Sequence, residues 1–244
     1  MTRMTHDLTR RRALTVLTGG AASAFLAACG GSDKTSDTSE IPDETAGPYP
    51  GDGSNGPNAL ADSGVVRKNI TSSFGGASGT ADGVPTTIEM TLLDVAKGGA
   101  PLAGAAVYLW HCTADGQYSM YDPQVANENF LRGVQESDKD GRVTFTSIFP
   151  GAYAGRWPHI HFEVYESLDA ATQSGTKLKT SQIALPQEAC DAAYASDGYT
   201  QSVQNLASLS LDGDMVFSDG YGSQLATASG DADSGITLKL NVGV

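Results

Sequence analysis

A pair of histidines separated by one residue is the feature of this sequence that most clearly bears chemistry. His159 and His161 lie in the run HIHFEVY at residues 159–165, whose β-branched and aromatic residues favour a strand. Side chains alternate between the faces of a strand, so both imidazoles point the same way and make half of a metal site. The chain has only two other histidines, His6 and His111. The alternative is a strand with two exposed or hydrogen-bonded histidines.

Two tyrosines supply the other half of the predicted site. Tyr118 follows a predicted turn at residues 114–116, and Tyr153 lies in the loop that leads to the histidine pair. Phenolate and imidazole together suit trivalent iron better than zinc or copper. Two phenolates and a hydroxide would cancel the charge of Fe(III), so the site could be buried without a large desolvation penalty. We therefore predict one non-haem Fe(III) per chain, bound by Tyr118, Tyr153, His159 and His161. A zinc or copper oxidoreductase that uses the histidine pair with water ligands is the weaker alternative.

Short strands bounded by turns must position these residues. One helix is expected over residues 187–195, after Pro186. We predict an all-β fold, an antiparallel β-sandwich of prealbumin-like or Greek-key type with long loops and one or two short helices. Non-catalytic sandwiches share this pattern and use Tyr153 for packing, so the fold alone does not predict an enzyme. Alternating apolar residues predict strands over residues 88–95, 105–111, 141–149, 159–165, 178–185 and 236–242.

The N-terminal residues resemble an export signal, and we do not expect them to belong to the folded domain. The run TRRRAL at residues 9–14 resembles a twin-arginine signal, and LAAC at residues 26–29 resembles a bacterial lipobox. We expect residues 1–28 to be a lipoprotein signal peptide, residues 29–44 a flexible linker with a lipidated Cys29, and residues 45–244 the folded domain. The protein would then be exported by the twin-arginine route and lie on the outer face of the cell membrane, or be secreted.

The charge of the chain limits its partners. The formal net charge is −13, and without residues 1–28, which hold four Arg and one Asp, 11 basic and 27 acidic side chains leave −16. Such a charge argues against nucleic acid, and against contact with a membrane other than through the lipid anchor. Cys112 and Cys190 are an even pair in an oxidising compartment, so they either form a disulfide or are two small buried residues.

Four segments, in order along the chain, carry a resemblance to a known family. They resemble the intradiol ring-cleavage dioxygenases, the family of protocatechuate 3,4-dioxygenase and catechol 1,2-dioxygenase. Any one segment is a weak signal, whereas all four in order, with all four ligand types present, make a strong one. The segments are TAGPY at residues 45–49, VYLW with DGQY at 107–118, DGRVTF with PGAY at 140–153, and R-W-P-H-I-H-F at 156–162.

The resemblance implies a substrate, a reaction and roles for individual residues. A catechol-type diol would bind Fe(III) through both oxygens, react with O2 and open between its hydroxylated carbons to give a muconate-type diacid. Tyr153 would be the ligand that the substrate displaces, and its freed phenolate would take a substrate proton. Arg156 would stabilise negative charge that develops on the ring, unless it forms a surface salt bridge. Residues Gly47, Pro48 and Tyr49 would line the substrate pocket, unless they form only a turn.

Some positions differ from the family pattern. Members commonly have Arg-Pro-x-His, whereas here Pro158 directly precedes His159. His111 stands where many members have glutamine. We expect a structural or surface role for it; the alternatives are contact with a metal ligand or service as a spare ligand. A non-catalytic surface β-sandwich that binds catecholate ligands or iron is the alternative function. The ring substituents of the substrate, and the choice between a monomer and a homodimer, are left open.

Overall fold

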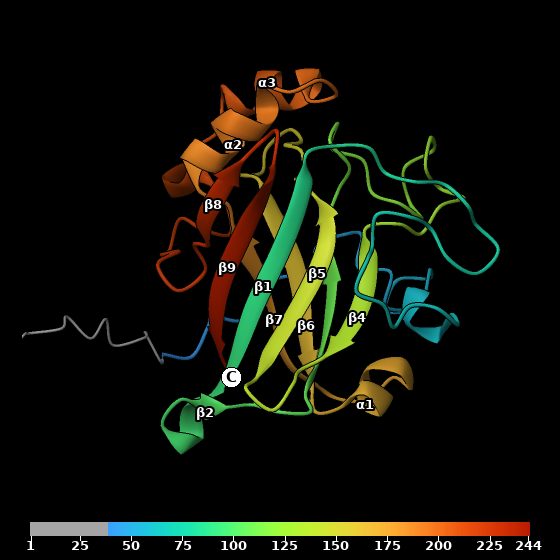
Figure 1. The fold of residues 1–244 in the computed structure, drawn as a ribbon, viewed down its shortest axis with the longest axis vertical. Helices are drawn as coiled ribbons and strands as arrows, with labels where there is room; N and C mark the ends of the chain where they lie inside the picture. The colour runs from blue at the N-terminus through green and yellow to red at the C-terminus, as the bar shows by residue number, and fades with distance from the viewer. Residues whose placement is uncertain (1–38) are drawn as a thin grey trace, which may run out of the picture. The chain divides into compact units, whose positions relative to one another are not determined.

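The structure is a computed structural model, and it describes residues 39–244 (Figure 1). The predicted signal peptide, Cys29 and most of the predicted linker lie outside the described residues. Within residues 39–244, no helix is long and apolar enough to cross a membrane.

Two β-sheets form the domain (Figure 1). The first sheet has the strand order β2-β1-β9-β8, with β5 also paired to β1, and the second has the order β4-β3-β6-β7. The prediction of an all-β sandwich is therefore confirmed, although β1 and β9 pair in parallel rather than antiparallel. The strands are β1 (Pro85–Asp94), β2 (Ala100–Pro101), β3 (Ala106–Trp110), β4 (Arg132–Glu136), β5 (Arg142–Ile148), β6 (His159–Tyr165), β7 (Lys177–Ala184), β8 (Thr227–Asp231) and β9 (Gly235–Gly243).

Helices and helical turns are short and lie between the strands. Where the sequence predicted one convincing helix, the described residues contain three, each of five to eight residues. They are α1 (Leu168–Thr172), α2 (Gln187–Tyr194) and α3 (Thr200–Leu206), and the 3-10 turns are η1 (Ala59–Ala61), η2 (Val95–Lys97) and η3 (Leu211–Gly213).

The second sheet is buried on both faces. One face packs on the first sheet through aliphatic side chains, and we call it the inner face; Val107, Leu109, Ile160 and Phe162 lie there. The opposite, outer face belongs to a separate cluster that includes Tyr108, Trp110 and Tyr118. The predicted alternation of faces along residues 105–111 is thus present in β3.

The segment that precedes β1 contributes to the cover of this outer face. Ala59, Leu60, Val65 and Phe74 pack in the same cluster as Tyr108 and Trp110. The ordered part begins before residue 45, because Ile41 is buried and its amide donates to the carbonyl of Gly243. Residues 40–44 were predicted to be linker, but the apolar side chain of Ile41 fixes them to the domain.

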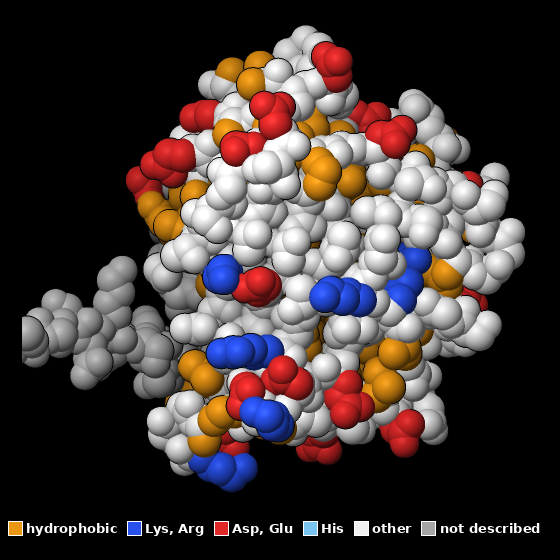
Figure 2. All heavy atoms as spheres, viewed as in Figure 1, with side chains coloured by type: hydrophobic (Ala, Val, Ile, Leu, Met, Phe, Trp, Pro, Cys, Tyr) orange, Lys and Arg blue, Asp and Glu red, His pale blue; other side chains and the backbone are white. Residues whose placement is uncertain are grey.

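The exposed face of the first sheet carries a mixed set of charges. Figure 2 shows basic and acidic side chains interspersed there, and no histidine is visible. His111, His159 and His161 are each no more than 2% exposed. The predicted site at His159 and His161 therefore lies in the interior.

Candidate metal and catalytic site

The structure brings the four predicted metal ligands together. His159 and His161 extend from one face of β6, and their Nε2 atoms are 3.0 Å apart. The Tyr153 hydroxyl lies 3.1 Å from Nε2 of His159. The ring of Tyr118 lies 5.7 Å from that of Tyr153 and 6.2 Å from that of His161, between ring centroids. We call these four residues the tetrad.

Two loops deliver the tyrosines to the histidine strand. A turn over residues 113–117 precedes Tyr118, whose amide donates to Asp122 Oδ2 at 2.6 Å. Gly116 in this turn has φ +90°, and a Cβ there would lie 3.2 Å from Cβ of Tyr153. A glycine at this position therefore lets the two tyrosine loops approach closely.

Burial sets the protonation of the tetrad. It lowers the pKa of His159 to about 3, with a smaller contribution from the charge of Arg156, and it lowers the pKa of His161 well below its usual value. Burial also raises the pKa of Tyr153 to about 12 and that of Tyr118 well above its usual value. Without a bound cation, the histidines are neutral and the tyrosines are protonated at neutral pH.

The geometry of the tetrad fits a bound metal ion. Two donors about 2.1 Å from one ion, at right angles, are about 3.0 Å apart, which matches the separation of the two Nε2 atoms. Tyr118 Oη is buried and has no hydrogen bond of normal geometry within residues 39–244, so an ion would supply its missing partner. The same residues contain no cluster of three or more His, Cys, Asp or Glu suited to a metal. A metal held by the tetrad would therefore need phenolate ligands.

Arg156 lies beside the tetrad as a buried ion pair rather than on the surface. Its Nε donates to Asp214 Oδ2 at 3.0 Å, and its Nη2 donates to Gln182 Oε1 at 2.7 Å. Asp214 also accepts from the amide of Trp157 at 2.6 Å, so the segment just before His159 is fixed to the same carboxylate. These contacts, together with burial of Arg156, hold the guanidinium in one place next to the histidine strand.

Two of the three predicted pocket residues lie against the tetrad. Gly47 has φ +69°, and a Cβ there would lie 3.3 Å from Cε1 of His161. The Tyr49 ring lies 5.1 Å from that of Tyr118. Pro48 is exposed, and its carbonyl accepts from the side chain of Asn55 at 2.7 Å. Gly47 is also part of a turn, because its amide donates to Thr45 Oγ1.

Part of the chain matches a known protein family. Residues 56–176, which contain the whole tetrad, match the family described as Dioxygenase. The chain carries an intradiol ring-cleavage dioxygenase domain. Its sequence is 32% identical over 116 residues to catechol 1,2-dioxygenase 1 of Acinetobacter lwoffii, covering 40% of this chain and 36% of that protein. It is 40% identical over 55 residues to a chlorocatechol 1,2-dioxygenase of Rhodococcus opacus, covering 22% and 21%. The matches thus span about a third or less of these relatives.

Solved structures share the fold of this dioxygenase domain. An intradiol ring-cleavage dioxygenase from Tetranychus urticae superposes with a TM-score of 0.64 at 24% identity, covering 84% of this chain and 93% of that one. Hydroxyquinol 1,2-dioxygenase from Pseudomonas putida DLL-E4 gives a TM-score of 0.51 at 19% identity, covering 85% and 67%. The similarity extends beyond the segment matched in sequence, to most of the described domain.

His111 and the two cysteines lie outside the tetrad of the dioxygenase domain. Both ring nitrogens of His111 are occupied, by the carbonyl of Cys112 at 2.8 Å and by Ser147 Oγ at 2.7 Å. The residue is 1% exposed, and its contact with Ser147 links the end of β3 to β5 of the first sheet, which supports the structural alternative. Cys112 and Cys190 are both buried and free, which is the second of the two alternatives considered.

Sequence reasoning missed several residues that support the tetrad. Trp110 stacks on His161, Gln182 and Asp214 bind Arg156, and the buried guanidinium of Arg132 donates to the carbonyl of Tyr49. Gln182 and Asp214 are 26 and 58 residues from Arg156, so no local spacing connects them. Trp110 was placed on the same face as Tyr108, and its register opposite His161 required the strand pairing.

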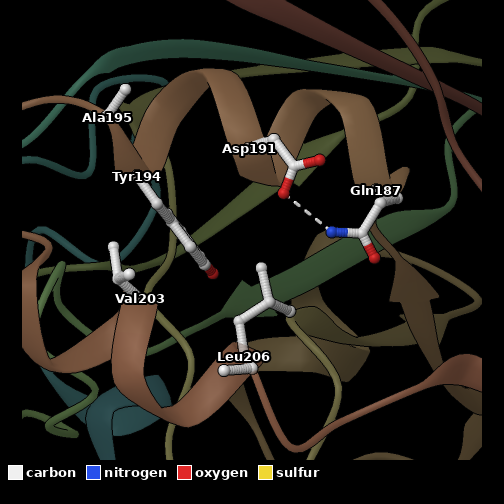
Figure 3. A pocket seen from close by; sticks show the side chains of 7 residues that line it. Gln187, Asp191, Tyr194, Ala195, Val203 and Leu206 are labelled. Atoms are coloured by element: carbon white, nitrogen blue, oxygen red, sulfur yellow. Dashed lines mark hydrogen bonds between the residues drawn. The ribbon is translucent and has the colours of Figure 1, made fainter.

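A separate groove of about 480 Å³ lies between α2 and α3 (Figure 3). Tyr194, Val203 and Leu206 line it, and Gln187 donates to Asp191 at 2.8 Å along its edge. None of its lining residues belongs to the tetrad or to the predicted pocket.

Proposed function

We propose that this domain is a non-haem Fe(III) intradiol dioxygenase that cleaves catechol-type diols with O2 to muconate-type diacids. The observation that carries this proposal is the meeting of two phenols and two imidazoles, with Nε2 atoms 3.0 Å apart, in a buried site of a dioxygenase domain. Two of the curated relatives are a catechol 1,2-dioxygenase and a chlorocatechol 1,2-dioxygenase, which makes catechols the first substrates to test.

The bound ion would supply a Lewis acid that draws the diol oxygens toward it and makes the ring reactive to O2. Tyr118, Tyr153, His159 and His161 would hold it. The imidazoles are neutral because of burial, and this is the form in which histidine binds a metal.

The two tyrosines have different freedom to move. Tyr118 is 1% exposed, whereas Tyr153 is only partly buried and lies in a loop next to the exposed residues Ala154 and Gly155. We therefore assign Tyr153 to leave when the substrate arrives and to take a diol proton at its Oη, while Tyr118 stays in place. A tyrosine whose own pKa is raised by burial is a strong base once it is freed as phenolate.

Arg156 would act on the substrate ring through its position beside His159. Asp214 and Gln182 hold the guanidinium, so it need not reorganise when negative charge develops nearby. The charge of Asp214 also limits how strongly Arg156 attracts anions.

The test is a visible absorption spectrum of the iron-loaded protein before and after addition of catechol under O2. A broad tyrosinate–iron band that shifts on addition of catechol and decays as a muconate ultraviolet band grows is the expected result. A shift without product points to a protein that only binds catechols. A colourless protein that contains a different metal would overturn the iron site.

We further propose export by the twin-arginine route, with cleavage before Cys29 and lipidation of its sulfur. The support is the sequence alone: the paired Arg10 and Arg11, the apolar stretch to Ala28, and the Cys that follows it. Fractionation of cells that produce the full chain or C29S tests this. The full chain should be found with membranes and C29S should not, and equal partition of both would contradict the lipid anchor.

A further inference from the structure

The two histidines of the tetrad are held in different ways. A histidine that binds a metal usually donates its other ring N–H to a carbonyl, a carboxylate or water. His159 follows this rule, since its Nδ1 lies 2.5 Å from the carbonyl of Trp157. Nδ1 of His161 is buried and has no hydrogen-bond partner within residues 39–244. Something other than a hydrogen bond from the protein must therefore orient the ring of His161.

Trp110 lies flat against this ring. The two ring centroids are 4.9 Å apart and the planes differ by only 3°. Trp110 and His161 are direct cross-strand partners on β3 and β6, and Trp110 is fully buried. Tyr108 stacks with Trp110 at 5.0 Å, and its hydroxyl donates to the carbonyl of Pro50 at 2.8 Å. A tilt of the imidazole plane would thus have to displace a fixed indole.

Gly47 limits the ring at its metal-facing edge. A Cβ at this glycine would lie 3.3 Å from Cε1 and 3.7 Å from Nε2 of His161, so the loop backbone is close to the edge that carries the ligand nitrogen. The loop is anchored on both sides of Gly47. Gln182 Nε2 donates to the carbonyl of Thr45 at 2.8 Å, and Arg132 Nη2 donates to the carbonyl of Tyr49 at 3.0 Å.

We infer that Trp110 and Gly47 are positioning residues for His161, which replace the hydrogen bond that orients His159 and keep its Nε2 directed at the metal. This inference rests on the proposed iron site, but the orientation of the ring is also a property of the metal-free protein.

The first experiment compares G47A with G98A. Both glycines have φ +69°, in the left-handed region where alanine is strained, whereas a Cβ at Gly98 meets nothing within 4 Å. We expect G47A to lose bound iron to a chelator about 10-fold faster than wild type or more, and to shift the visible band. G98A should match wild type in both. Equal behaviour of the two variants would overturn the role of Gly47.

The second experiment replaces Trp110. W110L should accelerate iron loss about 10-fold or more, and W110F, which keeps a ring to stack, should recover most of the wild-type value. F145L is the matched control, because Phe145 is also fully buried but packs between the sheets. F145L should lower the thermal midpoint without a change in iron loss or in the band. If W110L and F145L lower the midpoint alike and neither changes iron loss, Trp110 has only a packing role.

A readout on the metal-free protein separates this inference from the proposed function. Protons above an aromatic ring resonate upfield, so the His161 ring protons should be displaced upfield in wild type and W110F, and the displacement should vanish in W110L. If wild type binds no iron but shows this pattern, the proposed function fails and the positioning role stands. If the His161 signals do not respond to W110L, the positioning role fails.

Discussion

The two faces of the second sheet are built from the same strands but carry side chains of different kinds. Along β6, Ile160, Phe162 and Val164 face inward and are fully buried among aliphatic side chains. His159, His161, Glu163 and Tyr165 alternate with them on the outer face and are just as inaccessible. Along β6 the inner face needs only close packing, which non-directional apolar contact provides.

Polar groups on the outer face need individual partners. Glu163 is 0% exposed, and its carboxylate accepts from Lys177 Nζ at 2.7 Å and from the Tyr165 hydroxyl at 2.7 Å. Arg132 gives hydrogen bonds to the carbonyls of Tyr49, Pro50 and Ser119. In β6, apolar packing thus closes one face, and side chains with many hydrogen bonds close the face that carries the two histidines.

The largest difference between the two faces is expected for two neighbouring substitutions, H161A on the outer face and I160V on the inner face. We expect H161A to abolish iron binding, visible colour and turnover, because one of four ligands is lost. I160V should keep iron and cost about 0.5–1.5 kcal/mol of stability. Metal analysis and the visible spectrum check this, and full iron occupancy in H161A would remove His161 from the site.

Truncation of a side chain on the inner face should lower stability and leave iron binding unchanged, which is the reverse of the effect expected for H161A. Phe162 is fully buried, so F162A should lower the free energy of unfolding by about 3–5 kcal/mol, measured with urea. The iron content per folded chain should be unchanged, because the side chain points away from the tetrad. F162L is the milder variant if F162A does not fold. Loss of iron at unchanged stability would show that the two faces are not separable.

His111 is a polar residue on the inner face, and it should make stability depend on pH. Burial lowers its pKa from 6.5 to about 4, so the folded state binds fewer protons than the unfolded state between these values. Its contribution is therefore complete above pH 6.5 and is lost as the pH falls toward 4, by about 3 kcal/mol. Urea unfolding of metal-free wild type and H111Q at several pH values measures the difference. Parallel curves would contradict this.

The smallest effect is expected at the edge of the cover. The Tyr121 hydroxyl accepts from the amide of Gly51 at 2.8 Å and donates to Asn55 Oδ1 at 2.7 Å. Y121F should cost about 1 kcal/mol, seen as a small decrease in the thermal midpoint, with turnover retained. A loss of turnover would show that the contacts of Tyr121 with Gly51 and Asn55 also help to position the tetrad.

Periodicity found the strands with strong alternation and missed those without it. The run at residues 159–165 coincides with β6, and the predicted strand over residues 141–149 contains β5. β4 begins with a buried arginine and a glycine, and all five residues of β8 are exposed, so neither has an apolar pattern to detect. The helices α1 and α3 span only five and seven residues, which is too short for an apolar helical period to repeat.

The tetrad could be predicted because its members differ chemically from their surroundings, whereas its supports could not. His159 and His161 are neighbours on one face of a single strand, and each tyrosine follows a recognisable turn. Asp214 and Gln182 reach Arg156 from distant segments, and the stacking of Trp110 depends on strand register. Residue type can therefore suggest the ligands, but only the fold identifies what orients them.

The parallel pairing of β1 with β9 also has a consequence for biosynthesis. Thr86 pairs with Ile236, 150 residues later in the chain, and β9 lies between β1 and β8 in the sheet. Ile236, Leu238 and Leu240 belong to the same core cluster as Ile160 and Phe162. As long as β9 is still inside the ribosome, the inner face of β6 has no complete partner sheet. The core around β6 can therefore form only after β9 has emerged from the ribosome, and the tetrad on the opposite face of that strand is held in place only from then on.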